Sequence, residues 1–226
     1  MRLSRQLHHL LAIACIVVLA GCITIEENYT FKKDGSGTLE YVIDLSSFAD
    51  LMKSMKEMSD DKGKGDESIG DMDMKDEMQR IKGIEGISKV KVKEEQDGFV
   101  QRLSFRFADV NALNKALNVL MPDSSGQEKA FFAWEGSTLV RTTNRFAKEM
   151  GSDIASDGDD TTDVSGILKM MQYKYSFAFA EEIAEVGIAE GVVREDPSAR
   201  EVKLSTDWSV IMNDPRALDL RIAVKK

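Results

Sequence analysis

Histidine and cysteine, the residues that most often act as bases, nucleophiles and zinc ligands, are almost confined to the start of this chain. The sequence has 226 residues with two histidines and two cysteines, and His8, His9 and Cys15 all come before Cys22. Residues 22–226 therefore contain no histidine and a single cysteine. Without an imidazole, this part of the chain has no Ser-His-Asp triad, no histidine base and no zinc site of the Cys/His kind.

Carboxylates are the remaining candidates for acid–base or metal chemistry, and none of the 39 acidic residues stands in a catalytic motif. The densest group lies in one polar stretch: Asp153, Asp157, Asp159, Asp160 and Asp163. A calcium loop that began at Asp153 would place Gly158 correctly. It would also place Ala155 and Val164 where ligand oxygens are needed, so the spacing predicts a solvated loop, with weak calcium binding as the alternative. We expect no enzymatic activity, no cofactor and no resident metal.

Methionine is the soft ligand that recurs at regular spacing. Two runs place it at helical intervals: Met52, Met55, Met58, Met72, Met74 and Met78. Thioethers bind Cu(I), and they also fill irregular cores and adaptable binding grooves. The same spacing gives an amphipathic helix its apolar face, so we expect packing on the domain or on a partner. The candidate ligand or partner face is therefore Met52, Met55, Met58, Met74 and Met78, and a Cu(I) site is the alternative.

The net charge argues against nucleic acid as a partner. Residues 22–226 carry 28 basic and all 39 acidic residues, which gives a net charge of −11. Such a surface repels a phosphate backbone and, more broadly, anionic lipid headgroups. Lys89, Lys91 and Lys93 are a local exception that fits lipid phosphates. Lysines on one face of a strand also protect the edge of a sheet from pairing, which is the simpler interpretation.

The segment that ends at Cys22 has the organisation of an export signal. Two arginines precede an apolar run over residues 10–19, which is too short to cross a membrane because a span needs about 20 residues. Residues 19–22 read LAGC and resemble the lipobox of bacterial lipoproteins. The resemblance implies a diacylglyceryl thioether on Cys22, cleavage before Cys22 and acylation of the new amine. Two or three acyl chains would anchor the protein stably in a membrane.

The residues after Cys22 suggest where and how closely the protein is held. Ile23 stands where enterobacterial lipoproteins retained in the inner membrane have aspartate, so the resemblance favours the outer membrane and a periplasm-facing domain. Ile23, Ile25, Tyr29 and Phe31 alternate with polar residues, interrupted only at Glu27, and predict a strand. We therefore expect no flexible tether between the anchor and the domain. An acylated Cys22 also leaves no pair for an internal disulfide.

The start of the expected mature chain resembles a group of bacterial envelope lipoproteins. Residues 22–45, CITIEENYTFKKDGSGTLEYVIDL, have a cysteine, an acid-bearing strand, an Asp-Gly-Ser-Gly turn and a second strand. This is similar to the opening of uncharacterised lipoproteins and of the LppM-type lipoproteins of the mycobacterial envelope. The segments within residues 84–120 add to the resemblance. It implies a binding module rather than an enzyme, with lipid or glycolipid as the ligand class, and it transfers no site residue.

Hydrophobic periodicity predicts the elements that position these residues. Alternation predicts strands over residues 23–32, 39–45, 88–93, 99–107, 131–134, 138–143, 173–180, 202–206 and 218–224. Helical spacing predicts helices over residues 48–58, 72–82, 110–120 and 167–171, with polar loops at 59–71 and 148–166. Strands joined by short turns, with few helices between them, predict an α+β fold: antiparallel sheets built from hairpins, with amphipathic helices packed on them.

The sequence therefore predicts a signal peptide over residues 1–21 and a lipid-anchored domain over residues 22–226. If the domain consists of two parts, the polar insertion at 148–166 separates them into residues 22–147 and 167–226. The leading hypothesis is a non-catalytic envelope protein that binds or scaffolds a protein or lipid near the membrane surface. The alternatives are a lipid or glycolipid carrier and a Cu(I)-binding protein.

Overall fold

The computed structural model describes residues 23–50, 74–122, 126–142, 164–214 and 216–225. Cys22, the polar insertion up to residue 163 and three of the candidate methionines (Met52, Met55 and Met58) lie outside these ranges. No helix among the described residues is long and apolar enough to cross a membrane.

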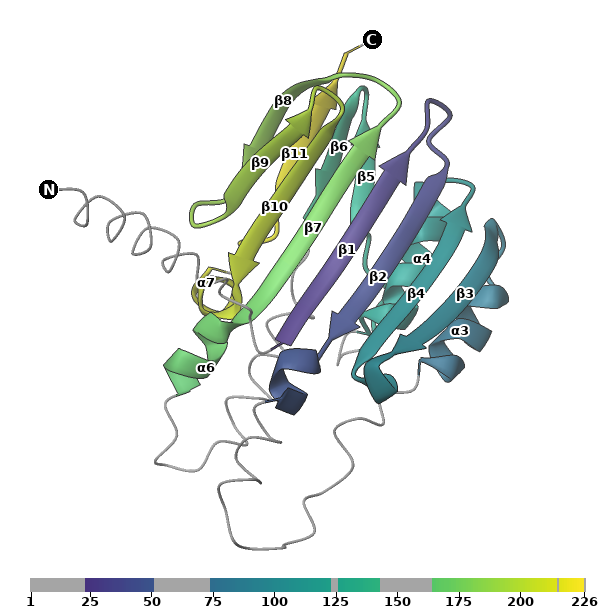
Figure 1. Ribbon diagram of the computed structural model, residues 1–226. Coiled ribbons are helices and arrows are strands. Elements are labelled where there is room, and N and C mark those ends of the chain that lie inside the picture. Colours follow the sequence, from purple (N-terminus) through teal and green to yellow (C-terminus); the bar gives the residue numbers. More distant parts are fainter. Residues whose placement is uncertain (1–22, 51–73, 123–125, 143–163, 215, 226) are drawn as a thin grey trace, which may run out of the picture.

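A seven-stranded sheet forms the main layer, in the order β3-β4-β2-β1-β7-β10-β9 (Figure 1). Its strands are β1 (Ile23–Phe31), β2 (Gly37–Asp44), β3 (Ile87–Glu95), β4 (Val100–Phe107), β7 (Met171–Phe179), β9 (Val193–Ser198) and β10 (Glu201–Asp207). All neighbours are antiparallel except β1 and β7, which run parallel in the centre of the sheet. The N-terminal strand is therefore enclosed between two partners.

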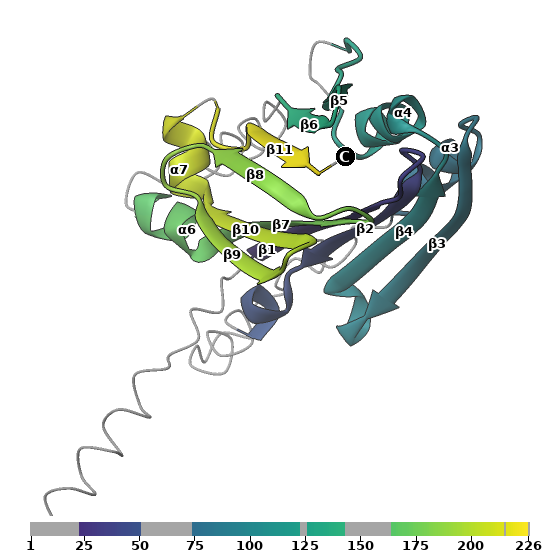
Figure 2. The same cartoon turned by 90° about the horizontal axis from the view of Figure 1, so that it is seen from above.

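A four-stranded antiparallel sheet lies on one side of this layer, in the order β5-β6-β11-β8 (Figure 2). It consists of β5 (Phe132–Glu135), β6 (Thr138–Arg141), β8 (Ile183–Ile188) and β11 (Leu220–Val224). Residues 46–50 are helical, and further helices are α3 (Lys75–Lys82), α4 (Val110–Leu120), α6 (Val164–Met170) and α7 (Trp208–Asn213), with a short 3-10 turn, η2 (Gln96–Gly98). Helices α3 and α4 pack near β3 and β4, while α6 and α7 pack near β7 and β10.

Aromatic side chains fill the space between the two sheets. The rings of Tyr29 and Phe177 stack with their centroids 5.1 Å apart, and the ring of Phe132 from the second sheet meets Tyr29 edge-on at 5.0 Å. Phe31 and Phe179 continue the stack at 5.6 Å. Rings in such geometries contribute about 0.5–1.5 kcal/mol per pair beyond the area they bury. The two sheets therefore share one packed core.

The turn after β1 explains why its sequence is rich in small residues. The Oδ1 atom of Asp34 accepts hydrogen bonds from the backbone N–H and the hydroxyl of Ser36, at 3.0 and 2.7 Å. Gly35 has a φ of +80°, which favours glycine. A side chain at Gly37 would collide with the carbonyl oxygen of Thr30 and the ring of Phe107. The hairpin between β1 and β2 therefore depends on this Asp-Gly-Ser-Gly sequence.

The predicted α+β class is confirmed, and so are most of the predicted strands. Three elements were not predicted: β8, β9 and α7. Every residue of β9 is exposed, so it has no hydrophobic alternation to detect. Helix α7 spans only six residues, and Trp208, its first residue, follows β10 directly. The helix predicted over 72–82 begins at Lys75 among the described residues.

Candidate functional site

Glu27 and Arg141 form a buried ion pair that joins the two sheets. Glu27 lies in β1 and is fully buried, and Arg141, the last residue of β6, is 1% exposed. The two guanidinium NH₂ groups donate to the carboxylate in a forked arrangement, at 2.7 Å to Oε2 and 3.1 Å to Oε1. A bidentate geometry of this kind is the strongest form of the contact. The alternation of β1, for which the sequence predicts an interruption at Glu27, continues through this residue. Glu27 occupies an inward position between Ile25 and Tyr29.

Two tyrosines complete the hydrogen bonding of the buried carboxylate. The Tyr29 hydroxyl donates to Glu27 Oε2 at 2.7 Å, and the Tyr173 hydroxyl donates to Oε1. The guanidinium also lies near the faces of three rings, with Cζ 5.5 Å from the centroid of Tyr175. Cation–π contacts of this kind favour the charged guanidinium. The cluster is therefore built to hold one negative and one positive charge inside the core.

Burial and the neighbouring charges shift the pKa values of this cluster in a consistent direction. Desolvation raises the pKa of Tyr29 and Tyr173, and the negative charge of Glu27 raises both further. Desolvation is the largest influence on Arg141 and would lower its pKa, but the Glu27 carboxylate and the two tyrosines together outweigh it, so this pKa is raised. Both tyrosines are therefore neutral donors and Arg141 is a cation at neutral pH.

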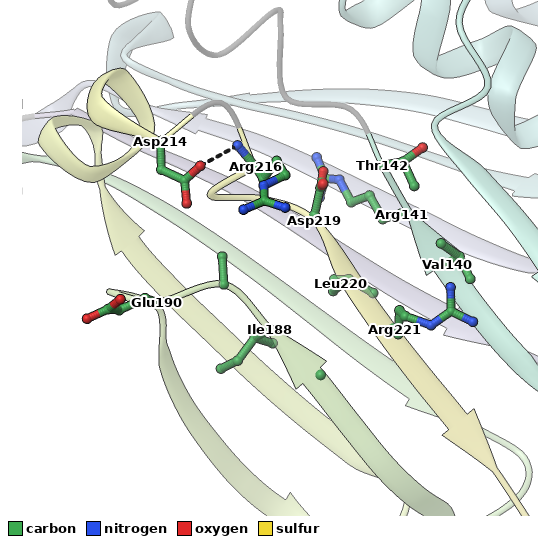
Figure 3. Close-up of a pocket in the computed structure, with 12 residues that line it drawn as sticks. Val140, Arg141, Thr142, Ile188, Glu190, Asp214, Arg216, Asp219, Leu220 and Arg221 are labelled. Carbon is green, nitrogen blue, oxygen red and sulfur yellow. Dashed lines mark hydrogen bonds between the residues drawn. The ribbon is translucent and has the colours of Figure 1, made fainter.

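A surface pocket of about 500 Å³ reaches inward to Arg141 (Figure 3). Its walls come from the end of β6, the end of β8 and the residues that lead into β11. Apolar side chains such as Val140, Ile188 and Leu220 line part of it, and several charged side chains line the rest. A pocket of this size, partly apolar and with a few polar groups converging in it, has the properties of a small-molecule site.

The pocket lies at the end of the fold where β1 begins. Ile23 is paired with Met171, the first residue of β7, and Gln172 is paired with Asp207, the last residue of β10. Helix α7 follows directly, and Asp214, Arg216 and Asp219, just after it, line the pocket. Helix α7 and the start of β1 lie at the same end of the seven-stranded sheet (Figure 1), and the pocket is lined by residues that follow α7.

Two buried polar atoms of opposite kind face this pocket without a hydrogen-bond partner among the described residues. They are the Nε atom of Arg141, a donor, and the Oδ1 atom of Asp219, an acceptor. The hydroxyl of Tyr175, behind Arg141, also has no partner there. Desolvation raises the pKa of Asp219, although the positive charges of Arg216 and Arg141 oppose the shift. Buried polar groups are nearly always satisfied, so these atoms mark a place for water or a ligand.

The candidate methionines in the described part of the chain pack on the domain. Met74 is 6% exposed and belongs to the core, and Met78 is half-buried against it. Both contribute to the apolar face that continues with Ile81, which is fully buried. This agrees with the packing interpretation for these two residues. Among the residues that the structure describes, no group of three or more Asp, Glu, His or Cys side chains could hold a metal ion.

The lysines predicted on one strand lie on β3, the outermost strand of the seven-stranded sheet. Lys91 and Lys93 pair opposite Ser104 and Arg102 of β4, on the outward-facing side. Lys89 departs from the regular face, because the register shifts between Ser88 and Lys91 and Lys89 has a φ of +54°. A bulge and lysines on an edge strand are two common protections against unwanted pairing, so their position supports the structural interpretation.

Comparison with known proteins gives a match among solved structures alone. No family model and no curated protein matches the chain. Among solved structures, the chain is similar to the folded domain of the Mycobacterium tuberculosis protein LppM, determined by NMR, with a TM-score of 0.42 and 11% sequence identity. The alignment covers 91% of each chain. We therefore argue the function from this chain's own residues.

Neither the buried ion pair nor the pocket was predicted from the sequence. Glu27 and Arg141 are 114 positions apart, and no local pattern relates them. A signal was present in each strand alone: Glu27 stands at an inward position of a strand, and Arg141 stands two residues after the fully buried Leu139. A charged residue on an inward face requires a partner of opposite charge.

Proposed function

We propose that this chain is a lipid-anchored protein of the bacterial cell envelope that has no catalytic activity and binds a ligand or partner at the membrane surface. One observation carries the proposal: the central strand of the domain begins at Ile23, one residue after the cysteine of the LAGC sequence. An acyl group on Cys22 would then be attached almost directly to the folded domain.

The burial of β1 supports a rigid connection. Ile25, Tyr29 and Phe31 are each 1% exposed, and burying each such side chain contributes about 1.5–3 kcal/mol. Strand β1 is also hydrogen-bonded along its length to β2 on one side and to β7 on the other. Releasing this strand to serve as a tether would break up the middle of the sheet, so the segment cannot double as a flexible linker.

The length of the free connection sets the distance from the membrane. An extended residue spans about 3.3–3.6 Å, so a strand that begins at the residue directly after the acylated cysteine starts within a few ångströms of it. The domain would then act on molecules in or on the bilayer rather than across the periplasm. The absence of Asp after Cys22 favours the outer membrane as its location.

The core favours a surface site over an internal lipid cavity. A carrier would need an apolar cavity between the sheets and the methionine helices, of order 300–1,000 Å³. In the described residues, aromatic side chains fill the space between the sheets, and Met74 packs into the same core. The pocket beside Arg141 lies instead at the surface, on the end of the fold where β1 begins. We propose that pocket as the binding site.

Fluorescence quenching by headgroup-labelled lipids tests the close attachment. Lys169, an exposed residue of α6, lies beside the start of β1, whereas Lys33, in the turn after β1, lies at the far end of the strand. Nine residues of strand separate these ends by about 30 Å at 3.3 Å per residue. Lys169→Cys and Lys33→Cys each introduce one free thiol into the mature chain for a fluorophore, because Cys22 is blocked by its lipid.

In vesicles carrying a spin-labelled headgroup, the fluorophore at position 169 should be quenched and that at position 33 should not. Insertion of a 20-residue Gly/Ser linker after Cys22 should remove the difference, because such a linker has a mean span of about 25 Å. Equal quenching at both positions without the linker would show that the domain is not held at the bilayer, and would overturn the proposal.

A further inference from the structure

The pocket beside Arg141 has two requirements that one ligand must meet together. The Nε–H of Arg141 needs an acceptor, and the Oδ1 atom of Asp219 needs a donor. Leaving such buried groups unpaired costs about 1–3 kcal/mol each, and more when they are charged. A ligand with only acceptors would satisfy Arg141 and be repelled by Asp219. A ligand with only donors would do the reverse.

The charges around the pocket point to the kind of donor and acceptor. Arg141 and Arg221 are each paired with a carboxylate, Glu27 at 2.7 Å and Glu135 at 2.6 Å. Their positive charges are therefore balanced within the protein. Apart from these pairs and Asp214, which has partners of its own, the charged side chains of the lining are the cation Arg216 and the anions Glu190 and Asp219. A surplus of negative charge with one cation beside it suits a ligand that carries both charges.

The positions of Arg216 and Asp219 are fixed by the backbone. The N–H of Ala217 donates to the carbonyl of Asp214 at 3.1 Å, and the N–H of Asp219 donates to the carbonyl of Arg216 at 2.9 Å. The Asp214 carboxylate accepts a further bond from the backbone N–H of Arg216, at 2.8 Å, as Figure 3 shows. These turns hold the cation and the Asp219 carboxylate on one short segment, and both residues line the pocket.

We infer that the pocket binds the zwitterionic headgroup of a phospholipid with a primary amine, a phosphoethanolamine group. Its ammonium donates to Asp219, and its phosphate oxygens accept from Arg216 and from the Nε–H of Arg141. An ammonium has three N–H donors, whereas the trimethylammonium of a choline headgroup has none and would leave Asp219 unpaired. The pocket therefore discriminates between the two zwitterions by hydrogen bonding.

The membrane is the source of this ligand if the protein is held at the bilayer, so this part of the inference rests on the proposed function. The pocket lies at the end of the fold where β1 begins, which would place it on the membrane side of the domain. The headgroup chemistry itself depends only on the pocket. A soluble headgroup therefore tests the site without a bilayer.

Calorimetric titration of the mature protein in dodecyl maltoside micelles tests the chemistry. Glycerophosphoethanolamine should bind, whereas glycerophosphocholine and glycerophosphoglycerol should bind at least about tenfold more weakly, the effect of losing a hydrogen bond to a charged group. Asp219→Asn and Arg216→Gln should each weaken the binding by a similar factor. Glu85→Gln and Arg106→Gln are the matched controls, because both residues are exposed and lie outside the pocket lining.

Equal binding of the choline or glycerol headgroup, an unchanged affinity in Asp219→Asn, or no binding at millimolar concentration would each overturn the inference. Circular dichroism of the two pocket variants shows whether they remain folded, and Arg141 is left unchanged because it supports the core. In nanodiscs, addition of phosphatidylethanolamine to a phosphatidylcholine bilayer should prevent the soluble headgroup from binding. Undiminished binding of the soluble headgroup in these nanodiscs would overturn the inference that the bilayer supplies the ligand. The quenching experiment separately tests attachment to the bilayer.

Discussion

Removing one partner of the Glu27–Arg141 pair should destabilise the protein far more than removing both. Both side chains are at most 1% exposed, so Arg141→Met leaves an uncompensated carboxylate in the core and Glu27→Gln leaves an uncompensated guanidinium. Breaking a buried pair in this way costs about 3–5 kcal/mol. In the double variant no charge remains, and the new amide at position 27 still offers an oxygen to the tyrosine hydroxyls. We expect its cost to be about 1–3 kcal/mol, the range for unsatisfied hydrogen bonds.

Urea denaturation of the four proteins in the same micelles measures this double-mutant cycle. The free energies of unfolding in water, obtained by linear extrapolation, should give a coupling energy of at least about 3 kcal/mol between the two positions. The double variant should also be more stable than either single variant. Additive losses would refute the reasoning, because they would show that each charge is solvated well enough to stand without the other.

Three other outcomes follow from the same residues. Cys22→Ser should leave an unprocessed precursor without radiolabelled palmitate, and labelled mutant protein would exclude Cys22 as the acylation site. Met74→Ala should lower the free energy of unfolding by about 2–5 kcal/mol, as expected for a buried methionine, while Met74→Leu has little effect. Tight Cu(I) binding that is abolished by Met74→Leu and Met78→Leu would contradict the packing role. Because its folded-state pKa is raised, ionised Asp219 weakens stability above that pKa, so Asp219→Asn should not destabilise the protein at pH 7; a lower melting temperature would contradict this.

Alternation was sufficient to predict the strands that have one buried face. Tyr173, Tyr175 and Phe177 alternate with polar residues, and β7 is found where they predict it. Strand β9 has no buried residue, and its place in the sheet comes from pairing with β10 alone. An exposed edge strand has no hydrophobic pattern, so a sequence-based prediction could not have found it.

A different reason explains why the candidate site could not be predicted from the sequence. Its residues come from strands that are distant in sequence, and only the packing of one sheet on the other brings Arg141 to Glu27. The parallel pairing of β1 with β7, which connects the first strand to a segment about 150 residues later, was also outside the reach of local patterns. Conversely, the close spacing of Cys22 and β1 was visible in the sequence, and the structure places β1 in the centre of the sheet.

Hydrogen exchange of the β1 backbone in the lipidated, vesicle-bound protein tests the central claim most directly. Amides from Thr24 to Phe31 are enclosed between β2 and β7, so they should be protected to the same degree as those of β7. That result would show that the folded domain begins at the anchor. Exchange of the amides of Thr24–Phe31 at the rate of an unfolded chain would show that this segment is a flexible tether, and would contradict a domain held directly at the membrane.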